Sequence, residues 1–270
     1  MKTIYHFSGA GNDFVVIDGR EGDVSSFREV PRIEALCKEY KTDGLMILGS
    51  GDAGVDFTME FYNPDGSGGM MCGNGGRCIV AFADYLGIKP SCHPELAEGS
   101  YLFMASDGLH TGEILERPED GLWTVRIKMI DVQGITPMLG GYFLNTGTRH
   151  FVKFVEDVEQ VDVDAEGKAL RWNEAFAPIG TNVNFVHVAP DGLHVRTFEK
   201  GVEGETLACG TGLTAAAIAA YSASVIPSEA KESVRLRARQ DWLSVNFTPG
   251  VDEKFTDVYL TGPARLVEIR

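Results

Sequence analysis

The amino-acid sequence predicts an α+β protein of two pseudo-symmetric domains, each a curved, mostly antiparallel sheet wrapped around a central helix. The first observation is a repeated pattern, CGNG at 72–75 and CGTG at 209–212, whose copies lie about half the chain apart. Each copy is followed by small and apolar residues typical of a helix, within 77–83 and 213–220. Most other apolar runs are short and strand-like, which favours one sheet packed on one helix per domain.

The first half of the chain predicts several strands and two helices. Residues 32–40 predict a helix because their apolar side chains recur at helical spacing. The stretch 63–69 combines Asn, Pro, Asp and Gly, a strong turn signal, and leads into a second helix at 73–86. The predicted strands of this half are 4–7, 14–17, 45–48, 55–62, 101–105 and 109–115.

The second half repeats this order of elements. A glycine-containing loop at 199–206 leads into the second central helix at 210–222. Polar, proline-containing segments at 91–99 and 226–232 predict exposed loops, and we expect the acidic stretch 156–166 to face solvent. The predicted strands are 122–130, 142–145, 151–155, 182–188, 193–198, 234–237, 243–247, 258–261 and 264–269.

The chain length of 270 residues suits two medium domains with sizeable cores. We expect the first domain to span 1–115 and to carry Cys72, with 263–270 returning to it as a strand. We expect the second domain to span 116–262 and to carry Cys209.

Composition narrows the classes of function. The formal net charge of −15 argues against a nucleic-acid or anionic-membrane partner, because both need basic surface. No apolar run approaches the roughly 18 residues of a membrane span, and residues 1–7 are typical of a strand, so we expect a cytoplasmic location. The five cysteines show no disulfide framework and no zinc-type spacing, so we predict no metal site.

Two thiols at two helix N-termini indicate a specific chemistry. A helix N-terminus offers unpaired backbone N–H groups and a positive dipole end, which favour a thiolate and also hold a substrate carboxylate. The glycines that follow Cys72 and Cys209 let a ligand approach the backbone closely. One thiolate and one thiol on opposite faces of a substrate Cα can remove a proton and return it to the other side. This two-base racemisation or epimerisation needs no cofactor if the site stabilises the carbanion electrostatically.

The ordered motifs resemble the diaminopimelate epimerase family essentially from end to end. The motifs are GAGNDF at 9–14, NPDGS at 63–67, MCGNGGRC at 71–78 and GETLACGTG at 204–212. The resemblance implies a cofactor-independent epimerase that interconverts LL- and meso-2,6-diaminopimelate in lysine and peptidoglycan precursor biosynthesis. Its small-molecule substrate is an amino acid. A homodimer is kept as a prediction.

The resemblance also implies roles for individual residues. Cys72 and Cys209 match the family's catalytic acid/base cysteines, and His150 and Glu199 match the pair that tunes their pKa values. The residues that match substrate contacts are Asn12, Asn63, Gly73, Asn74, Thr148, Asn182, Glu199, Lys200, Gly210 and Thr211.

The chain departs from the family pattern toward the distal end of the ligand. Lys200 stands where the family usually has Arg, which keeps the charge but loses bidentate geometry. Thr148 and Arg149 replace the Asn and Pro of the usual GNPH motif, and Gly44 lies where some members have a substrate-contacting Gln. The loop 201–204 is one residue longer than in many members.

Other interpretations stay open at this stage. A racemase of another amino acid fits the same motifs, as do a thiol redox protein and a non-catalytic amino-acid-binding protein. Independently of the function, Asn12 and Asn63 also fit a role that only supports turns, and Glu199 with Lys200 also fits a solvated charge pair. We expect Cys37 and Cys78 to fill the core, and we expect no role for Cys92 in its polar loop.

Overall fold

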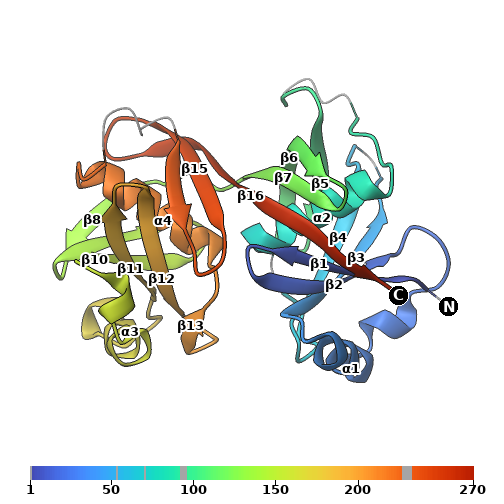
Figure 1. Ribbon diagram of the computed structural model, residues 1–270, viewed down its shortest axis with the longest axis horizontal. Coiled ribbons are helices and arrows are strands. Elements are labelled where there is room, and N and C mark those ends of the chain that lie inside the picture. Colours follow the sequence, from blue (N-terminus) through green and yellow to red (C-terminus); the bar gives the residue numbers. More distant parts are fainter. Residues whose placement is uncertain (1, 53, 70, 92–95, 227–232) are drawn as a thin grey trace. The chain divides into compact units, whose positions relative to one another are not determined.

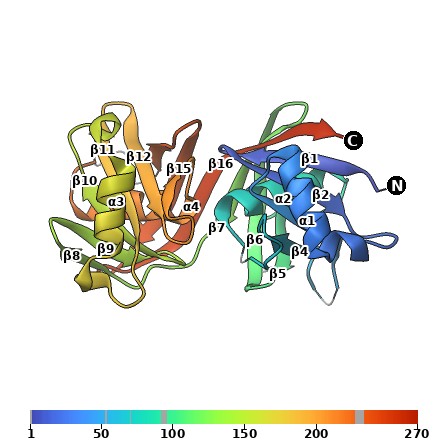
Figure 2. The same ribbon diagram turned by 90° about the horizontal axis from the view of Figure 1, so that it is seen from below.

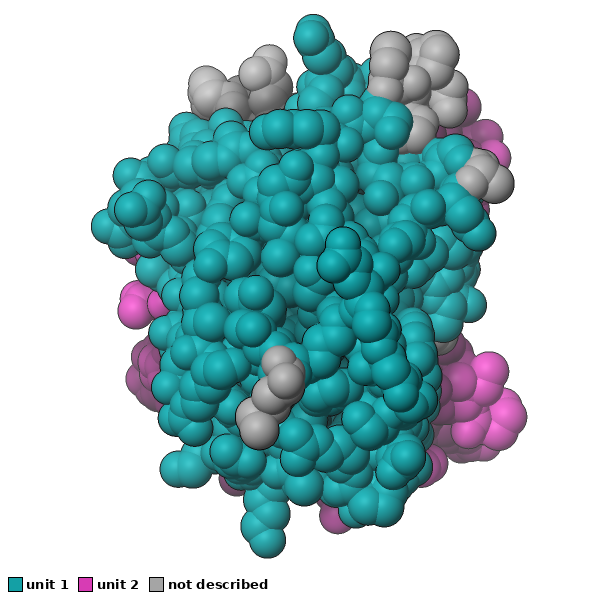
Figure 3. All heavy atoms as spheres, turned by 90° about the vertical axis from the view of Figure 1, so that its right-hand side faces the viewer, with its two compact units in different colours: residues 1–127, 262–270 teal, residues 128–261 magenta. Residues whose placement is uncertain are grey.

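In the computed structural model the chain divides into two compact units (Figures 1 and 3). The structure describes residues 2–52, 54–69, 71–91, 96–226 and 233–270. The first unit comprises 1–127 and 262–270, and the second comprises 128–261. The predicted loops 91–99 and 226–232 therefore fall partly outside the described residues, and Cys92 lies wholly outside them.

The first unit is a sheet that closes on itself around helix α2 (Gly73–Tyr85). Its strand order is β1-β2-β3-β4-β5-β6-β7-β16, and β16 pairs back onto β1. Every residue of α2 from Gly73 to Ala83 is buried, because strands enclose this apolar helix. The strands are β1 (Ile4–Gly9), β2 (Asn12–Asp18), β3 (Gly44–Ser50), β4 (Phe57–Tyr62), β5 (Ser100–Ala105), β6 (Gly108–Glu119), β7 (Leu122–Lys128) and the last part of β16 (Phe255–Ile269).

The second unit repeats this plan around helix α4 (Gly210–Ser222). Its strand order is β16-β15-β14-β12-β11-β10-β9-β8, with β13 added on β12. A bridge between Val132 and Phe255 joins the two ends of that order. The strands are β8 (Ile135–Met138), β9 (Gly141–Asn145), β10 (Arg149–Phe154), β11 (Asn182–Ala189), β12 (Gly192–Glu199), β13 (Gly204–Thr206), β14 (Val234–Arg237), β15 (Trp242–Pro249) and the first part of β16.

A second helix covers the outer face of each sheet. Helix α1 (Val30–Tyr40) packs on β2 and β3. Helix α3 (Val163–Arg171) packs on β11 and β12 (Figure 2). Alternate residues of β2 point to opposite faces of the sheet. Val15 and Ile17 belong to the hydrophobic cluster that includes Ile33 and Leu36 of α1 (the α1 cluster), while Val16 points to the other face. Strand β2 is therefore buried on both sides. Short 3₁₀ helices lie at Ser25–Arg28, Val158–Gln160 and Glu174–Phe176.

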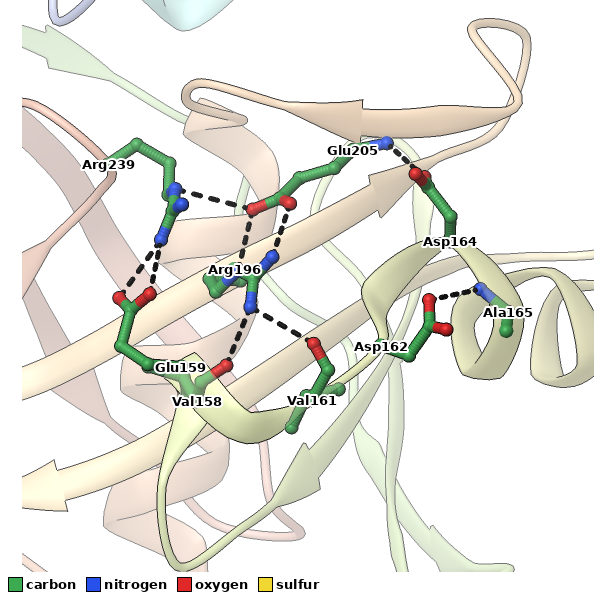
Figure 4. A network of polar contacts seen from close by, with 9 residues as sticks. All are labelled: Val158, Glu159, Val161, Asp162, Asp164, Ala165, Arg196, Glu205 and Arg239. Atoms are coloured by element: carbon green, nitrogen blue, oxygen red, sulfur yellow. Dashed lines mark hydrogen bonds and ion pairs between the residues drawn. The ribbon is translucent and has the colours of Figure 1, made fainter.

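A network of charged side chains fixes the segment that leads to the second central helix (Figure 4). Arg196 of β12 donates from Nε to Oε1 of Glu205 in β13 at 2.7 Å. Arg239 bonds Glu159 at 2.9 Å and lies 3.5 Å from Glu205. The backbone N–H of Glu205 donates to Asp164 of α3 at 3.0 Å. These contacts tie β13, four residues before Cys209, to both β12 and α3.

Two of the sequence-based expectations need correction. The first unit reaches 127 rather than 115, because β7 pairs with β6 and with the end of β16. The predicted strands 258–261 and 264–269 form the single strand β16. The acidic residues of 156–166 are exposed as expected, while Val158 and Val163 of the same stretch are buried and Asp162 caps the start of α3.

Arg77 is a fully buried arginine inside the first unit. Its guanidinium donates to Oδ1 of Asn74 at 2.9 Å, to the carbonyl of Gly73 at 3.2 Å and to the carbonyl of Pro263 at 3.3 Å. The side chain therefore joins the first turn of α2 to β16. Gly73 and Asn74 are buried, so their acceptor oxygens are left without this donor if the guanidinium is removed.

We predict that Arg77→Met lowers the free energy of unfolding by about 2–4 kcal/mol, because buried acceptors lose their donor. Urea denaturation followed by circular dichroism measures this change. The matched control is Arg28→Met, which breaks an exposed ion pair with Glu60 and should cost no more than about 1 kcal/mol. Equal stability of the two variants would show that Arg77 does not anchor α2.

Candidate active site

Cys72 is the N-cap residue of α2 and is exposed. The backbone N–H of Gly75 donates to its sulfur at 3.2 Å. A Cβ at position 75 would lie 3.3 Å from that sulfur, so glycine permits this close approach. A donated N–H and the positive end of the helix dipole both favour negative charge on the sulfur.

Asn74 and Asn12 meet beside Cys72. The side-chain amide of Asn74 donates to Oδ1 of Asn12 at 2.5 Å, which joins the first turn of α2 to the start of β2. Gly9 at the end of β1 lies against the same turn, where a Cβ would come within 2.8 Å of the Asn74 carbonyl. The first unit therefore brings together four predicted site residues: Asn12, Cys72, Gly73 and Asn74.

Asn63 and Gly44 are placed differently. Asn63 holds a turn, because its backbone N–H donates to the Ser67 carbonyl at 2.9 Å and its amide donates to the Ser67 hydroxyl at 3.0 Å. This contact matches the turn-supporting interpretation. At Gly44 a Cβ would lie 2.7 Å from both the Phe61 ring and the Tyr62 carbonyl, so this backbone excludes a side chain such as Gln.

Cys209 is the N-cap residue of α4 and is only 8% exposed. Its sulfur lies 3.4 Å from the hydroxyl of Thr211. That hydroxyl is 2.9 Å from Nε2 of His150 and 3.1 Å from the hydroxyl of Thr148. Thr146 donates to the Thr211 carbonyl at 2.8 Å. A polar cluster of three threonines and one histidine thus surrounds the start of α4.

His150 is fully buried and neutral. Burial lowers its pKa from 6.5 to about 3. Nε2 lies 2.9 Å from the Thr148 hydroxyl as well as from Thr211, and Nδ1 lies 3.0 Å from the Asn184 amide nitrogen. The ring therefore lies between β11 and the first turn of α4.

Asn182 ties the end of β12 to the loop before β10. Its amide nitrogen donates to the Thr148 hydroxyl at 3.2 Å and to the Arg149 carbonyl at 3.0 Å, and its oxygen accepts from the backbone N–H of Lys200 at 2.7 Å. Lys200 is exposed, and Glu199 precedes it as the last residue of β12.

The side chain of Arg149 turns away from this cluster. It donates to the Phe176 carbonyl at 3.3 Å and lies 5.0 Å over the Phe143 ring. The arginine that replaces the family's proline thus contacts the outer core of the second unit.

The two units use equivalent positions. In the parallel pairs β2–β3 and β10–β11, Phe14 stands opposite Gly44 and His150 opposite Asn182. This register makes Asn12 the counterpart of Thr148. Each of the two contacts the third residue of its own CGxG motif: Asn12 meets Asn74, and Thr148 meets Thr211.

Sequence reasoning missed Arg77 and Asn184. Arg77 lies within the motif 71–78. The sequence signal for it is a difference between the two motifs, because the equivalent position of the second motif holds the uncharged Thr214. The signal for Asn184 is its spacing of two residues from Asn182, which puts both side chains on one face of β11. The two remaining described cysteines, Cys37 and Cys78, are buried, and burial raises the pKa of both thiols.

Two features are absent from the described part of the chain. Within it, no group of three or more His, Cys, Asp or Glu residues is placed to hold a metal ion. The same residues include no helix that is long and apolar enough to cross a bilayer.

Solved structures share this fold along the whole chain. A phenazine biosynthesis protein of the PhzF family from Bacillus anthracis has a TM-score of 0.72 at 12% identity, with 100% of this chain and 98% of that chain covered. A probable proline racemase from Agrobacterium radiobacter has a TM-score of 0.67 at 13% identity, covering 100% and 92%. The class is therefore the two-unit α+β fold of these proteins, and the predicted fold class is confirmed.

The family follows from sequence. The diaminopimelate epimerase family model matches residues 4–110 and 142–267. A diaminopimelate epimerase from Chlorobaculum tepidum is 39% identical, covering 96% of this chain and 97% of its own length. One from Flavobacterium psychrophilum is 36% identical, covering 98% and 97%. The chain belongs to the diaminopimelate epimerase family.

The buried neutral His150 predicts a specific pH dependence of stability. Its folded pKa of about 3 lies below the unfolded value of 6.5, so the unfolded chain takes up a proton first as the pH falls. Between pH 7 and pH 5 the histidine should therefore cost the folded state about 2 kcal/mol.

Urea unfolding of wild type and His150→Gln at both pH values isolates this contribution. The stability difference between the two proteins should shift by about 2 kcal/mol in favour of the variant at pH 5. A difference that stays constant with pH would mean that His150 takes up its proton equally readily in the folded and unfolded states, so that its pKa is not lowered by burial.

Proposed function

We propose that this chain interconverts LL- and meso-2,6-diaminopimelate by proton exchange at Cα between Cys72 and Cys209. The observation that carries the proposal is the presence of one cysteine at the N-cap of one buried helix in each unit of a member of this family. The substrate is a small amino acid, and we place the reaction in the cytoplasm.

The reaction needs two proton carriers that act on opposite faces of one carbon. One cysteine thiolate takes the Cα proton and becomes a thiol, and the C–H electron pair passes into a carbanion. The second thiol gives its proton to the other face and becomes the thiolate. Backbone N–H groups at the two helix starts, next to Gly73, Asn74, Gly210 and Thr211, hold the substrate carboxylate and stabilise the developing charge.

The neighbouring side chains have supporting roles in this proposal. Asn12 and Thr148 orient the first turns of α2 and α4 through Asn74 and Thr211. His150 and Glu199 tune the charge of the cysteine sulfurs. Asn63 and Asn182 contact the substrate or hold the backbone that does so. Two cysteines supply both acid and base, so neither pyridoxal phosphate nor a metal is required.

Each cysteine should be indispensable. Cys72→Ala and Cys209→Ala should each lower kcat by at least about a hundredfold, because each removes the proton carrier of one face. Ser replacements should retain a trace of activity, since a hydroxyl relays a proton but is a far weaker acid. Turnover is measured with LL-diaminopimelate by resolving the meso product.

The control for these variants is Cys37→Ala, which changes a buried thiol of the α1 cluster and should keep wild-type kcat. Chelator and carbonyl reagents should leave the wild type active. The two-base assignment is wrong if either catalytic-cysteine Ala variant keeps more than about a tenth of wild-type turnover, a barrier change under about 1.4 kcal/mol.

Lys200 is the proposed partner of the distal carboxylate. Asn182 holds its backbone N–H, which fixes where the exposed side chain starts. Lys200→Ala should cost about 1.5–3 kcal/mol in kcat/KM, the range for a hydrogen bond to a charged group. Lys200→Arg should be tolerated, and the exposed Lys168→Ala in α3 is the matched control.

The comparison substrate for Lys200 is an analogue of diaminopimelate without the distal carboxylate. Wild type should prefer diaminopimelate, and Lys200→Ala should remove most of that preference. Equal turnover of both substrates by the wild type would instead favour a racemase of another amino acid.

A further inference from the structure

Asn184 is a fully buried carboxamide on β11 whose every hydrogen bond has a fixed direction. Its nitrogen donates to the Phe151 carbonyl at 3.3 Å, a group that can only accept. Its oxygen accepts from the Thr197 hydroxyl at 3.0 Å. These two contacts set the orientation of the amide, so its nitrogen faces Nδ1 of His150 at 3.0 Å.

This orientation decides where the proton of His150 resides. An amide N–H can only donate, so Nδ1 must be the unprotonated nitrogen of the neutral ring. The single ring proton is then on Nε2, which faces the hydroxyls of Thr148 and Thr211 at 2.9 Å each. Because Nε2 donates, neither hydroxyl is needed to donate to the ring.

The Thr211 hydroxyl therefore does not donate to the ring, and its proton is available to another acceptor. Thr148 already accepts from Asn182, and Thr211 lies 3.4 Å from the sulfur of Cys209. With Nε2–H donating to it, Thr211 can donate to that sulfur and stabilise negative charge there. In the opposite tautomer a hydroxyl proton would turn toward the ring.

We propose that Asn184 is a positioning residue for the epimerisation: by fixing the Nε2–H tautomer of His150 it directs the Thr211 hydroxyl toward Cys209. The inference rests on the proposed function. The first unit has no such chain, because Phe14 and Met46 occupy the positions of His150 and Asn184 there. The surroundings of the last glycine of each CGxG motif support the equivalence of Met46 and Asn184. A Cβ at Gly75 would lie 3.4 Å from the Met46 sulfur, and a Cβ at Gly212 would lie 2.3 Å from the Asn184 oxygen.

The tautomer can be measured without any turnover. Two-bond ¹H–¹⁵N correlation spectra of the ¹⁵N-labelled full chain, with His150→Gln used for assignment, separate Nε2–H from Nδ1–H rings. The wild type should show unprotonated Nδ1 and protonated Nε2 at His150. Asn184→Asp, which places an acceptor beside Nδ1, should show Nδ1 protonated. A wild-type ring protonated at Nδ1 would overturn the proposal, even if no variant folds.

Turnover supplies the second readout. Asn184→Leu, which removes the amide donor at similar volume, should lower kcat about tenfold or more with KM changed less than about threefold. Met46→Leu, the matched change at the equivalent position of the first unit, should keep wild-type kcat. Wild-type kcat in Asn184→Leu would refute the positioning role, whereas an inactive wild type would count against the proposed function itself.

Discussion

The structure depends on the burial of one whole helix inside the sheet of each unit. A buried helix start carries backbone N–H groups that the surrounding sheet must satisfy or leave to a ligand. The polar residues of each unit gather at that start for this reason: Asn12 and Arg77 at α2, and Thr148 and His150 at α4. Each cysteine is the N-cap residue of its helix, so the backbone N–H groups that need a partner lie next to the thiol.

The two units place different side chains at equivalent positions of the same fold. Behind Cys72 the strands present Phe14 and Met46, and the helix itself carries the charged Arg77. Behind Cys209 the strands present His150 and Asn184, and the helix carries Thr214, whose hydroxyl bonds the Gly210 carbonyl at 3.0 Å. The two helix starts therefore carry different polar groups, a buried arginine in one unit and hydrogen-bonded neutral side chains in the other.

The central helices were predicted well because each CGxG motif supplies an N-cap residue and a helix start, and an apolar run follows it. The expected 73–86 and 210–222 correspond to Gly73–Tyr85 and Gly210–Ser222. Helix α3 was missed because only three of its nine residues, Val163, Gly167 and Arg171, are buried, so its apolar pattern is weak. The direction of Arg149 and the pairing of Asn184 with His150 depend on tertiary neighbours, which no local pattern encodes. The two strands expected at 258–261 and 264–269 are one strand, in which Pro263 pairs opposite Thr124.

The central claim is that two different thiols handle the proton on the two faces of Cα. The most direct test is the conversion of LL-diaminopimelate in D₂O, followed by mass spectrometry of substrate and product early in the reaction. The account predicts that the meso product carries one solvent deuterium at the inverted Cα while the remaining LL substrate is still unlabelled. Product that retains the original protium at that carbon would contradict the account, because a single base would then be returning the proton it had removed.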